Sequence, residues 1–244
     1  MARSTAEPAG GAVAIDLKSL TPARVTLGRS GHSLTTAELL RFDLDHARAR
    51  DAVHEALDSG WLKHPHIEVA SAALDRRRYL LRPDLGRQLS PESAARLASG
   101  DYDAAIVIAD GLSAPAIHHH AAPFLDMLLP RLKEEQWRLA PLVVVRQARV
   151  AIADEIAHRL GARMAVILIG ERPGLTSPDS LGIYLTWEPR PARTTDAERN
   201  CISNVRPEGL PYPLAAHKLL FLMHESRRRR LSGVSLKESA KGLE

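Results

Sequence analysis

The clearest pattern of apolar and polar positions begins at residues 142–145, a short run of mostly β-branched residues. Such a run is typical of a strand that is buried on both faces of a parallel sheet. Over residues 151–160 apolar side chains recur at four-residue spacing, and Gly161 stands where a helix would end. Residues 165–169 are a second apolar run. The pattern predicts strand, crossover helix and strand, which together form a right-handed βαβ unit.

Two loops of this unit are the first candidates for a binding site. They follow the predicted strands at residues 146–150 and 170–174. In sheets built from such units, ligands bind outside the carboxyl ends of the strands. We therefore expect both loops to face a site.

The alternation of strands and helices extends to both sides of this unit. Residues 104–109 form an apolar strand, and Ser113 is placed to cap the helix that follows. Residues 181–187 alternate and predict a further strand. Residues 188–204, with prolines and arginines among charged side chains, are expected to be irregular, and a last helix is expected over residues 214–231.

The first hundred residues show no such alternation. A capping box at residues 35–38 predicts a helix, whereas residues 67–74 are compatible with a strand or a helix. The sequence thus predicts an α/β protein in three parts. These are a mobile leader over residues 1–20, a mainly helical N-terminal subdomain over residues 21–100, and a Rossmann-like domain with a parallel sheet and flanking helices over residues 101–244.

Composition narrows the classes of function. The chain carries a formal charge of +4, but acidic and basic residues are interspersed, and aromatic residues make up only 4%, too few for a base-stacking platform. We therefore expect no nucleic-acid partner. A single cysteine, Cys201, cannot form an internal disulfide, and no long apolar segment predicts a membrane helix or a signal peptide. These features favour the cytoplasm and no membrane partner.

Candidate catalytic motifs are weak. Neither of the glycine-rich phosphate-binding motifs, G-x-G-x-x-G of dinucleotide-binding proteins and G-x-x-x-x-G-K-[ST] of P-loop proteins, occurs in the chain. A near match to the nucleophile elbow of hydrolases has proline in place of its last glycine, which favours Ser113 as a helix cap only, in the run Gly111-Leu112-Ser113-Ala114-Pro115. A hydrolase that uses Ser113 stays open as an alternative.

Histidine and arginine clusters have ordinary explanations. The histidines at residues 118–120 follow one another, and consecutive helical residues point about 100° apart, so we expect no metal ligands there. The arginines at residues 76–78 and 227–230 favour solvated faces or subunit contacts, with nucleic-acid binding as an alternative. Cys201 lacks the local signature of a nucleophile.

Loop motifs along the chain resemble the small (light) subunit of ethanolamine ammonia-lyases. The matching segments keep their order from about Thr21 onward: Leu40-Arg41-Phe42, Asp45-His46, Tyr79-Leu80-Leu81-Arg82-Pro83-Asp84-Leu85-Gly86-Arg87, Asp110-Gly111-Leu112-Ser113, Val145-Arg146, Arg149-Val150, Gly170-Glu171-Arg172-Pro173-Gly174-Leu175 and Cys201-Ile202-Ser203-Asn204. The resemblance implies a subunit that holds adenosylcobalamin together with a large subunit, for the radical conversion of ethanolamine to acetaldehyde and ammonia. It also implies an assembly of six copies of each subunit.

The resemblance further implies which residues serve the cofactor. Carried over by motif, the positions that contact cobalamin are Val150, Glu171 and Cys201. No catalytic residue and no metal ligand are expected in this chain, because the family's radical chemistry occurs in the TIM barrel of the large subunit. The motif that supplies a histidine to cobalt is absent, so cobalamin is expected to keep its own benzimidazole as lower ligand. The family also implies a cytoplasmic enzyme, enclosed in a bacterial microcompartment where a longer N-terminal extension directs it.

Overall fold

The computed structural model describes residues 17–21 and 23–236, which fall into two compact units that meet between Asp45 and His46. The first unit holds α1 (Leu17–Leu20), a small antiparallel pair of strands, β1 (Arg29–Ser30) and β2 (Ser33–Leu34), and the beginning of α2 (Thr36–His54). Most of the predicted leader, residues 1–20, lies outside the described residues. The predicted helix that follows the capping box is confirmed as α2.

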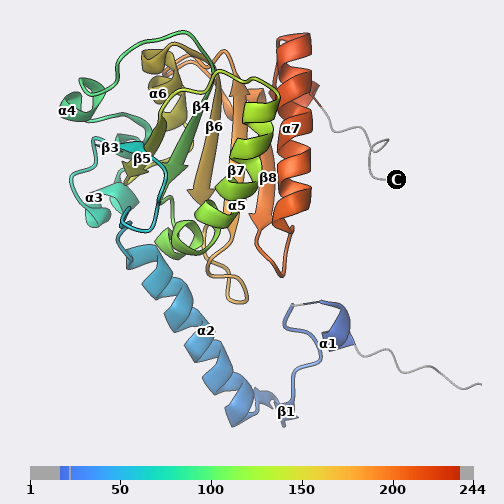
Figure 1. Cartoon of the computed structure of the whole chain (residues 1–244). Coiled ribbons are helices and arrows are strands. Elements are labelled where there is room, and N and C mark those ends of the chain that lie inside the picture. The colour runs from blue at the N-terminus through green and yellow to red at the C-terminus, as the bar shows by residue number, and fades with distance from the viewer. Residues whose placement is uncertain (1–16, 22, 237–244) are drawn as a thin grey trace, which may run out of the picture. The chain divides into compact units, whose positions relative to one another are not determined.

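The second unit is built on a six-stranded sheet (Figure 1). Its strands are β3 (His66–Ala70), β4 (Tyr102–Ala109), β5 (Leu142–Arg146), β6 (Ala162–Gly170), β7 (Leu181–Trp187) and β8 (Arg199–Val205). They lie in the order β3-β5-β4-β6-β7-β8. The first four in this order are parallel, and β7 and β8 are each antiparallel to their neighbours.

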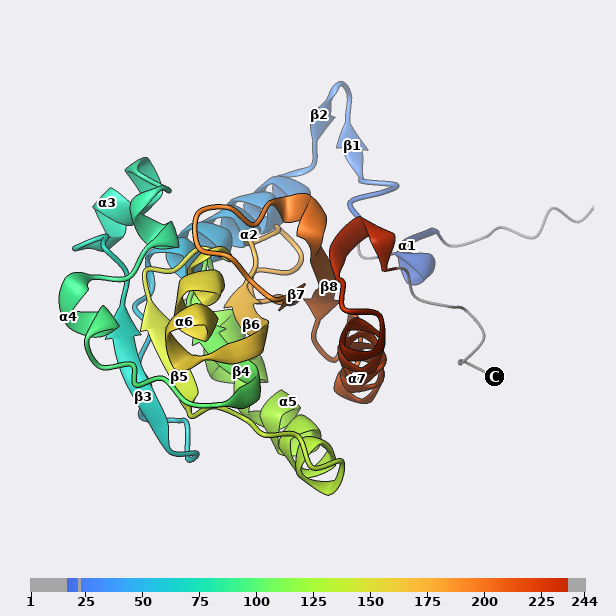
Figure 2. The same cartoon turned by 90° about the horizontal axis from the view of Figure 1, so that it is seen from above.

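Helices cover both faces of this sheet. Helices α5 (Ala114–Glu134) and α7 (Tyr212–Arg229) pack on one face, and α6 (Ile152–Leu160) packs on the other (Figure 2). Shorter helices, α3 (Arg76–Leu81) and α4 (Pro91–Ala94), lie in the connection between β3 and β4. Because successive strand residues point to opposite faces, Ile106 and Ile108 pack with α5 while Val107 packs with α6.

The predicted βαβ unit is confirmed. Its strands are β5 and β6, and its helix α6 ends at Gly161, whose positive φ of 73° places it in the left-handed region. Ser113 caps α5, as predicted, and accepts a hydrogen bond from the backbone N–H of Ala116. Residues 67–74, left open between strand and helix, begin within strand β3 (His66–Ala70), so the segment predicted as a mainly helical subdomain contributes an edge strand to the sheet.

Two predictions about the sheet are wrong. The sheet is mixed and not parallel throughout, because β6, β7 and β8 are joined by loops that contain no long helix, whereas a parallel connection needs a crossover of a dozen or more residues. Residues 188–204, expected to be irregular, contain all of β8 except its last residue. Polar and charged residues dominate β8 because it is the edge strand, and this composition conceals it in the sequence.

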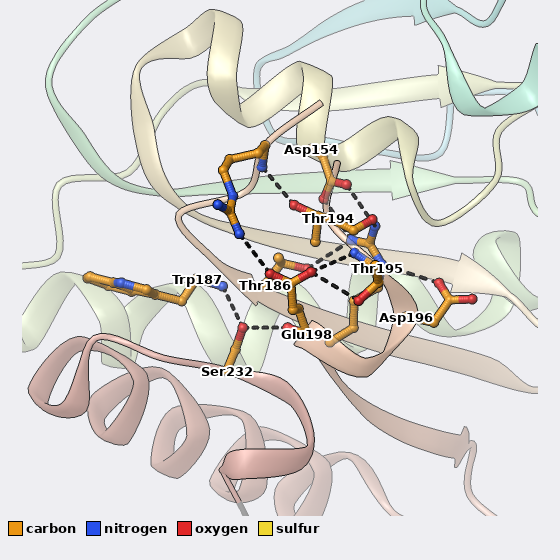
Figure 3. Close-up of polar contacts among 10 residues, drawn as sticks. Asp154, Thr186, Trp187, Thr194, Thr195, Asp196, Glu198 and Ser232 are labelled. Atoms are coloured by element: carbon orange, nitrogen blue, oxygen red, sulfur yellow. Dashed lines mark hydrogen bonds and ion pairs between the residues drawn. The ribbon is translucent and has the colours of Figure 1, made fainter. Parts of the chain in front are cut away.

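A buried ion pair fastens the edge strand β8 to α6. Both guanidinium nitrogens Nη1 and Nη2 of Arg199 donate to the carboxylate of Asp154 at 2.7 Å, and each side chain is at most 3% exposed. Nη1 of Arg199 also donates to Thr186 Oγ1 on β7 at 3.0 Å (Figure 3). The same figure shows Ser232, which accepts from the Trp187 backbone and donates to the carbonyl of Glu198. These contacts hold β8 on the sheet.

The chain topology opens a crevice between β4 and β6. After β4 the chain passes through α5 to β5 on one side, whereas after β6 it continues to β7 on the other side. The loops that follow these two neighbouring strands therefore diverge. In sheets with helices on both faces, such a point at the carboxyl ends of the strands is where ligands bind.

Candidate functional site at the carboxyl edge of the sheet

A pocket of about 430 Å³ lies at this crevice. Its wall is formed by the loops after β4, β5 and β6, with side chains from α3, β7 and β8. The lining residues are Tyr79, Gly111, Leu112, Arg149, Val150, Ile169, Gly170, Glu171, Arg172, Tyr184 and Ser203. Both loops that the sequence predicted to face a site, residues 146–150 and 170–174, contribute residues to this lining.

Two glycines allow the loops after β4 and β6 to touch. A Cβ atom on Gly170 would lie 2.0 Å from the carbonyl oxygen of Ser113 and 2.5 Å from that of Asp110. Gly111 has a φ of +55°, and its Cβ would lie 2.2 Å from the carbonyl oxygen of Gly170. The same carbonyl accepts the backbone N–H of Leu112 at 3.0 Å. Only glycine fits at these positions without displacing backbone atoms. The contact between the two loops fixes the position of Gly170 and therefore of Glu171, the next residue in the chain.

We expect Gly170→Ala to lower the free energy of unfolding by about 1–3 kcal/mol, the usual cost of forcing an extra methyl group into a packed site. The new Cβ would meet two backbone carbonyls that cannot rotate away. Urea denaturation of the full chain measures the change. Gly60→Ala is the matched control, because its Cβ would meet only the Asp58 carboxylate at 3.5 Å, an ordinary contact. Equal stability of the two variants would contradict the expectation.

Asp110 positions the loop after β5. Its carboxylate is buried, with Oδ2 accepting the backbone N–H of Gln147 at 2.8 Å and Oδ1 accepting that of Ala148 at 3.0 Å. Nη1 of Arg76 lies 3.3 Å from the same Oδ2. Burial raises the pKa of Asp110, while the two amides and Arg76 favour its charged form. The loop is thereby held so that Val150 lines the pocket.

Tyr79 forms the adjacent wall. Two guanidinium groups contact its ring, with the Cζ atoms of Arg76 and Arg149 at 4.6 Å and 4.3 Å from the ring centroid. Its hydroxyl donates to the carbonyl of Ala148 at 2.9 Å, and burial raises its pKa. Tyr79 therefore acts here as a neutral, fixed side chain. It holds Arg149 at the pocket, where this side chain is also a lining residue.

Glu171 has one oxygen engaged and one available. Oε2 accepts the hydroxyl of Ser180 at 2.7 Å and the backbone N–H of Asn204 at 3.2 Å. Gly182 makes room for this side chain, because a Cβ there would lie 3.1 Å from Cγ and Oε1 of Glu171. Among the described residues no hydrogen bond goes to Oε1, so this oxygen can accept a further donor. The carboxylate is thus oriented before any ligand arrives.

Cys201 lies beside this pocket and not in its wall. It is exposed on β8, opposite Tyr184 of β7, and lines a neighbouring pocket of about 500 Å³. Ser203 belongs to both pockets. Surrounding protein atoms raise the pKa of the Cys201 thiol, and Glu171 adds to this, so the thiol is poorly suited to act as a thiolate.

The structure thus brings two of the three predicted residues, Val150 and Glu171, into one pocket and places Cys201 at its border. Sequence reasoning did not single out Tyr79 or Tyr184 as site residues, although both line the pocket. In the folded chain Tyr184 is the one partly exposed position of β7 apart from the last residue of the strand, a feature that the sequence does not show. Its role depends on β7 pairing with β8, which the sequence did not predict.

The other candidate motifs serve the fold. Ser113 is fully buried, and its hydroxyl donates to the carbonyl of Pro178 at 2.8 Å, so it is no hydrolase nucleophile. Arg76 pairs with Asp110, and Arg227 pairs with Asp103 at 2.9 Å while lying over the ring of Trp137. One arginine of each cluster is thus held within the fold, while Arg77, Arg78, Arg229 and Arg230 are exposed. In the part of the chain that the structure describes, no helix is long and apolar enough to cross a membrane.

Comparisons with known proteins agree on one family. The family model described as ethanolamine ammonia-lyase light chain matches residues 13–237. The chain is 60% identical over 237 residues to a protein of Azotobacter vinelandii, covering 92% of this chain and 87% of that protein. It is 55% identical over 237 residues to a protein of Ralstonia nicotianae, with the same coverage, and 54% identical over 239 residues to one of Pseudomonas fluorescens, covering 93% and 87%. All three are named ethanolamine ammonia-lyase small subunit.

Proposed function

Because the chain belongs to the family of ethanolamine ammonia-lyase small (light) subunits, we propose that it binds adenosylcobalamin jointly with a large subunit. The assembly would convert ethanolamine to acetaldehyde and ammonia. The observation that carries the proposal is the pocket at the carboxyl edge of the sheet, where Val150 and Glu171 meet between the loops after β5 and β6. We propose that the six-stranded sheet, to which residues 101–244 contribute five strands and residues 66–70 the sixth, acts with its helices as a Rossmann-like cobalamin-binding domain.

The size and openness of this pocket favour a shared cofactor. A volume of about 430 Å³ is near the lower end of the ~300–1,000 Å³ of ordinary ligand pockets. A corrin ring with its side chains and nucleotide is larger than the ligands such a pocket encloses. The pocket therefore suits one edge of the cofactor, and a second protein has to cover the rest. This requirement supports a large subunit on the other side.

The donors and acceptors in the pocket match the rim of a corrin ring. This rim is apolar with projecting amides, so it needs small apolar contacts and hydrogen-bond acceptors. Val150 would supply the apolar contact, and Oε1 of Glu171 would accept an amide N–H. Since Oε2 is already bound to Ser180 and Asn204, Glu171 would lose little side-chain entropy on binding. Cys201, at the border, would contact the cofactor from β8.

Bound adenosylcobalamin would supply the radical by homolysis of its cobalt–carbon bond. The residues of this chain would hold the cofactor and exclude water from one side of it. The described residues that line the pocket include no histidine, and we propose that this chain supplies no ligand to cobalt. We propose six copies of each subunit in the assembly and a cytoplasmic location, with a microcompartment as the further site that the family implies.

The proposal is tested by mixing this chain, the family's large subunit, or both, with adenosylcobalamin and recording absorption and EPR spectra before and after adding ethanolamine. We expect a radical signal only with both proteins. A full signal from the large subunit alone would overturn the proposal. Size-exclusion chromatography with light scattering on the same mixture gives the stoichiometry.

We expect Glu171→Ala to lower the affinity of the assembled enzyme for adenosylcobalamin by ~10–150-fold, because one charge-assisted hydrogen bond contributes ~1.5–3 kcal/mol. Equilibrium dialysis measures the affinity, and light scattering confirms that both subunits still assemble. Glu134→Ala is the control, since Glu134 is exposed at the other end of α5. Unchanged affinity in Glu171→Ala would remove Glu171 from the site.

A further inference from the structure

A cluster of possible metal ligands lies outside the pocket, where α5 meets the loop between β6 and β7. His119 and His120 come from the first turns of α5, and Asp179 comes from the end of the loop. One ligand atom from each residue lies within 4.8 Å of the other two. Sequence reasoning expected no metal ligands here because consecutive helical residues diverge. The structure places a third residue between the two rings, so that both reach one carboxylate.

The separations are those of a metal site. Oδ2 of Asp179 lies 3.2 Å from Nδ1 of His119 and 3.5 Å from Nε2 of His120. Ligand atoms about 2.0–2.2 Å from a tetrahedral Zn²⁺ ion lie ~3.3–3.5 Å from one another. The side chain of His119 is 62% exposed, so its ring is free to move until Nδ1 lies at a similar distance from Nε2 of His120.

The buried ring nitrogen of His120 is the second, independent sign. His120 is only 6% exposed, yet its Nε2 makes no hydrogen bond with any described residue. Its other nitrogen, Nδ1, lies 2.7 Å from the hydroxyl of Tyr212. When Nδ1–H donates to Tyr212, Nε2 presents a lone pair toward the Asp179 carboxylate. Two acceptors at this distance repel one another unless a proton or a metal ion lies between them.

We propose that His119 Nδ1, His120 Nε2 and Asp179 Oδ2 bind a divalent transition-metal ion of the Zn²⁺ type. Two imidazoles and one carboxylate suit Zn²⁺ and not Mg²⁺ or Ca²⁺, which prefer oxygen ligands. Tyr212 orients His120 in the manner of the outer hydrogen bonds that fix metal-binding histidines.

The ion would fasten the loop that carries Glu171. Three consecutive loop residues are tied down: Pro178 by the hydroxyl of Ser113, Asp179 by the metal, and Ser180 by its bond to Glu171. Tyr212 at the start of α7 adds a third element. The metal would thus hold α5, α7 and the loop together without entering the pocket.

The test uses the full chain purified with a tag that contains no histidine. Mass spectrometry of metals after dialysis against Zn²⁺, and calorimetric titration with Zn²⁺, measure occupancy and affinity. We expect one Zn²⁺ per chain and a higher unfolding temperature with Zn²⁺ than without. Titration with Mg²⁺ should show no binding at this site. Failure to bind Zn²⁺ in the full chain overturns the proposal.

Variants separate this site from other histidines. His119→Gln and Asp179→Asn should weaken Zn²⁺ binding by more than ~100-fold, and Tyr212→Phe by about tenfold, because loss of an outer partner alone costs ~10–100-fold. His118→Gln is the matched control, since His118 instead pairs with Glu55 at 3.0 Å and accepts the backbone N–H of Asp58. Equal losses in His118→Gln and Asp179→Asn would overturn the assignment. The exposed position of His119 keeps its variant folded, which the unfolding temperature without Zn²⁺ checks.

A cobalt spectrum gives an independent readout. Co²⁺ in a site of two imidazoles and one carboxylate absorbs visible light, and this absorption should be lost in His119→Gln and kept in His118→Gln. A spectrum that is the same in both variants contradicts the ligand set. None of these measurements needs cobalamin or the large subunit, so their outcome is separate from that of the proposed function.

Discussion

Asp154→Ala is expected to lower the free energy of unfolding of the full chain by about 3–5 kcal/mol, the usual cost of removing one member of a buried ion pair. The loss is large because Arg199, only 3% exposed, would keep its charge without the carboxylate that accepts from two of its nitrogens. Urea denaturation followed by circular dichroism measures the change. Because Arg199 begins β8, we also expect Cys201 to become more reactive toward alkylating reagents.

Two further variants make this prediction sharp. Asp196→Ala removes the other carboxylate near Arg199. Because the Asp196 side chain is fully exposed and its Oδ1 lies 3.5 Å from Nε of Arg199, little change in stability is expected. The double variant Asp154→Leu/Arg199→Met replaces the pair by apolar side chains and should be more stable than Asp154→Ala, because no buried charge is left alone. If Asp196→Ala were as harmful as Asp154→Ala, the buried pair would not be the cause.

Asp110→Ala is expected to destabilise the chain by about 3–5 kcal/mol and to weaken cobalamin binding in the assembled enzyme. Removing the carboxylate leaves two buried backbone N–H groups, those of Gln147 and Ala148, without their acceptor and Arg76 without its partner. The loop that carries Val150 then loses its anchor. Urea denaturation and equilibrium dialysis with adenosylcobalamin measure the two effects.

Asp110→Asn distinguishes the loop anchor from simple loss of packing. Asparagine keeps the shape of the side chain, but its NH2 group replaces one of the two oxygens that accept a backbone N–H. We therefore expect a loss of stability that is smaller than in Asp110→Ala but still measurable. Asp84→Ala is the control, because Asp84 pairs with Arg82 at the exposed surface. Wild-type stability of Asp110→Asn would show that the two backbone hydrogen bonds contribute little.

The anchor at Asp110 and the glycine contact at Gly170 act on different loops of the same pocket. Asp110 positions the loop after β5, whereas Gly111 and Gly170 set the separation of the loops after β4 and β6. Since Gly170 packs directly against the carbonyl of Asp110, the effects of Asp110→Asn and Gly170→Ala on stability should not be additive.

The sequence by itself determined those helices and strands whose patterns depend only on residues close to one another in the chain. The apolar runs that became β5 and β6, the four-residue spacing of α6 and the glycine at its end were all legible. The cap at Ser113 was legible too, because a hydroxyl that accepts an N–H three residues later needs no distant partner. The motifs in the loops also indicated the family, which the comparisons confirmed.

Only the tertiary structure decided what depends on contacts between distant segments. The direction of β7 and the existence of β8 follow from pairing across long loops, and the polar residues of an edge strand carry no apolar signal. Likewise, His119 and His120 diverge along their helix and converge only because Asp179, 60 residues from His119, lies between them. Local periodicity reports on neighbours in the chain, whereas a site is set by side chains that the packed sheet and helices bring together.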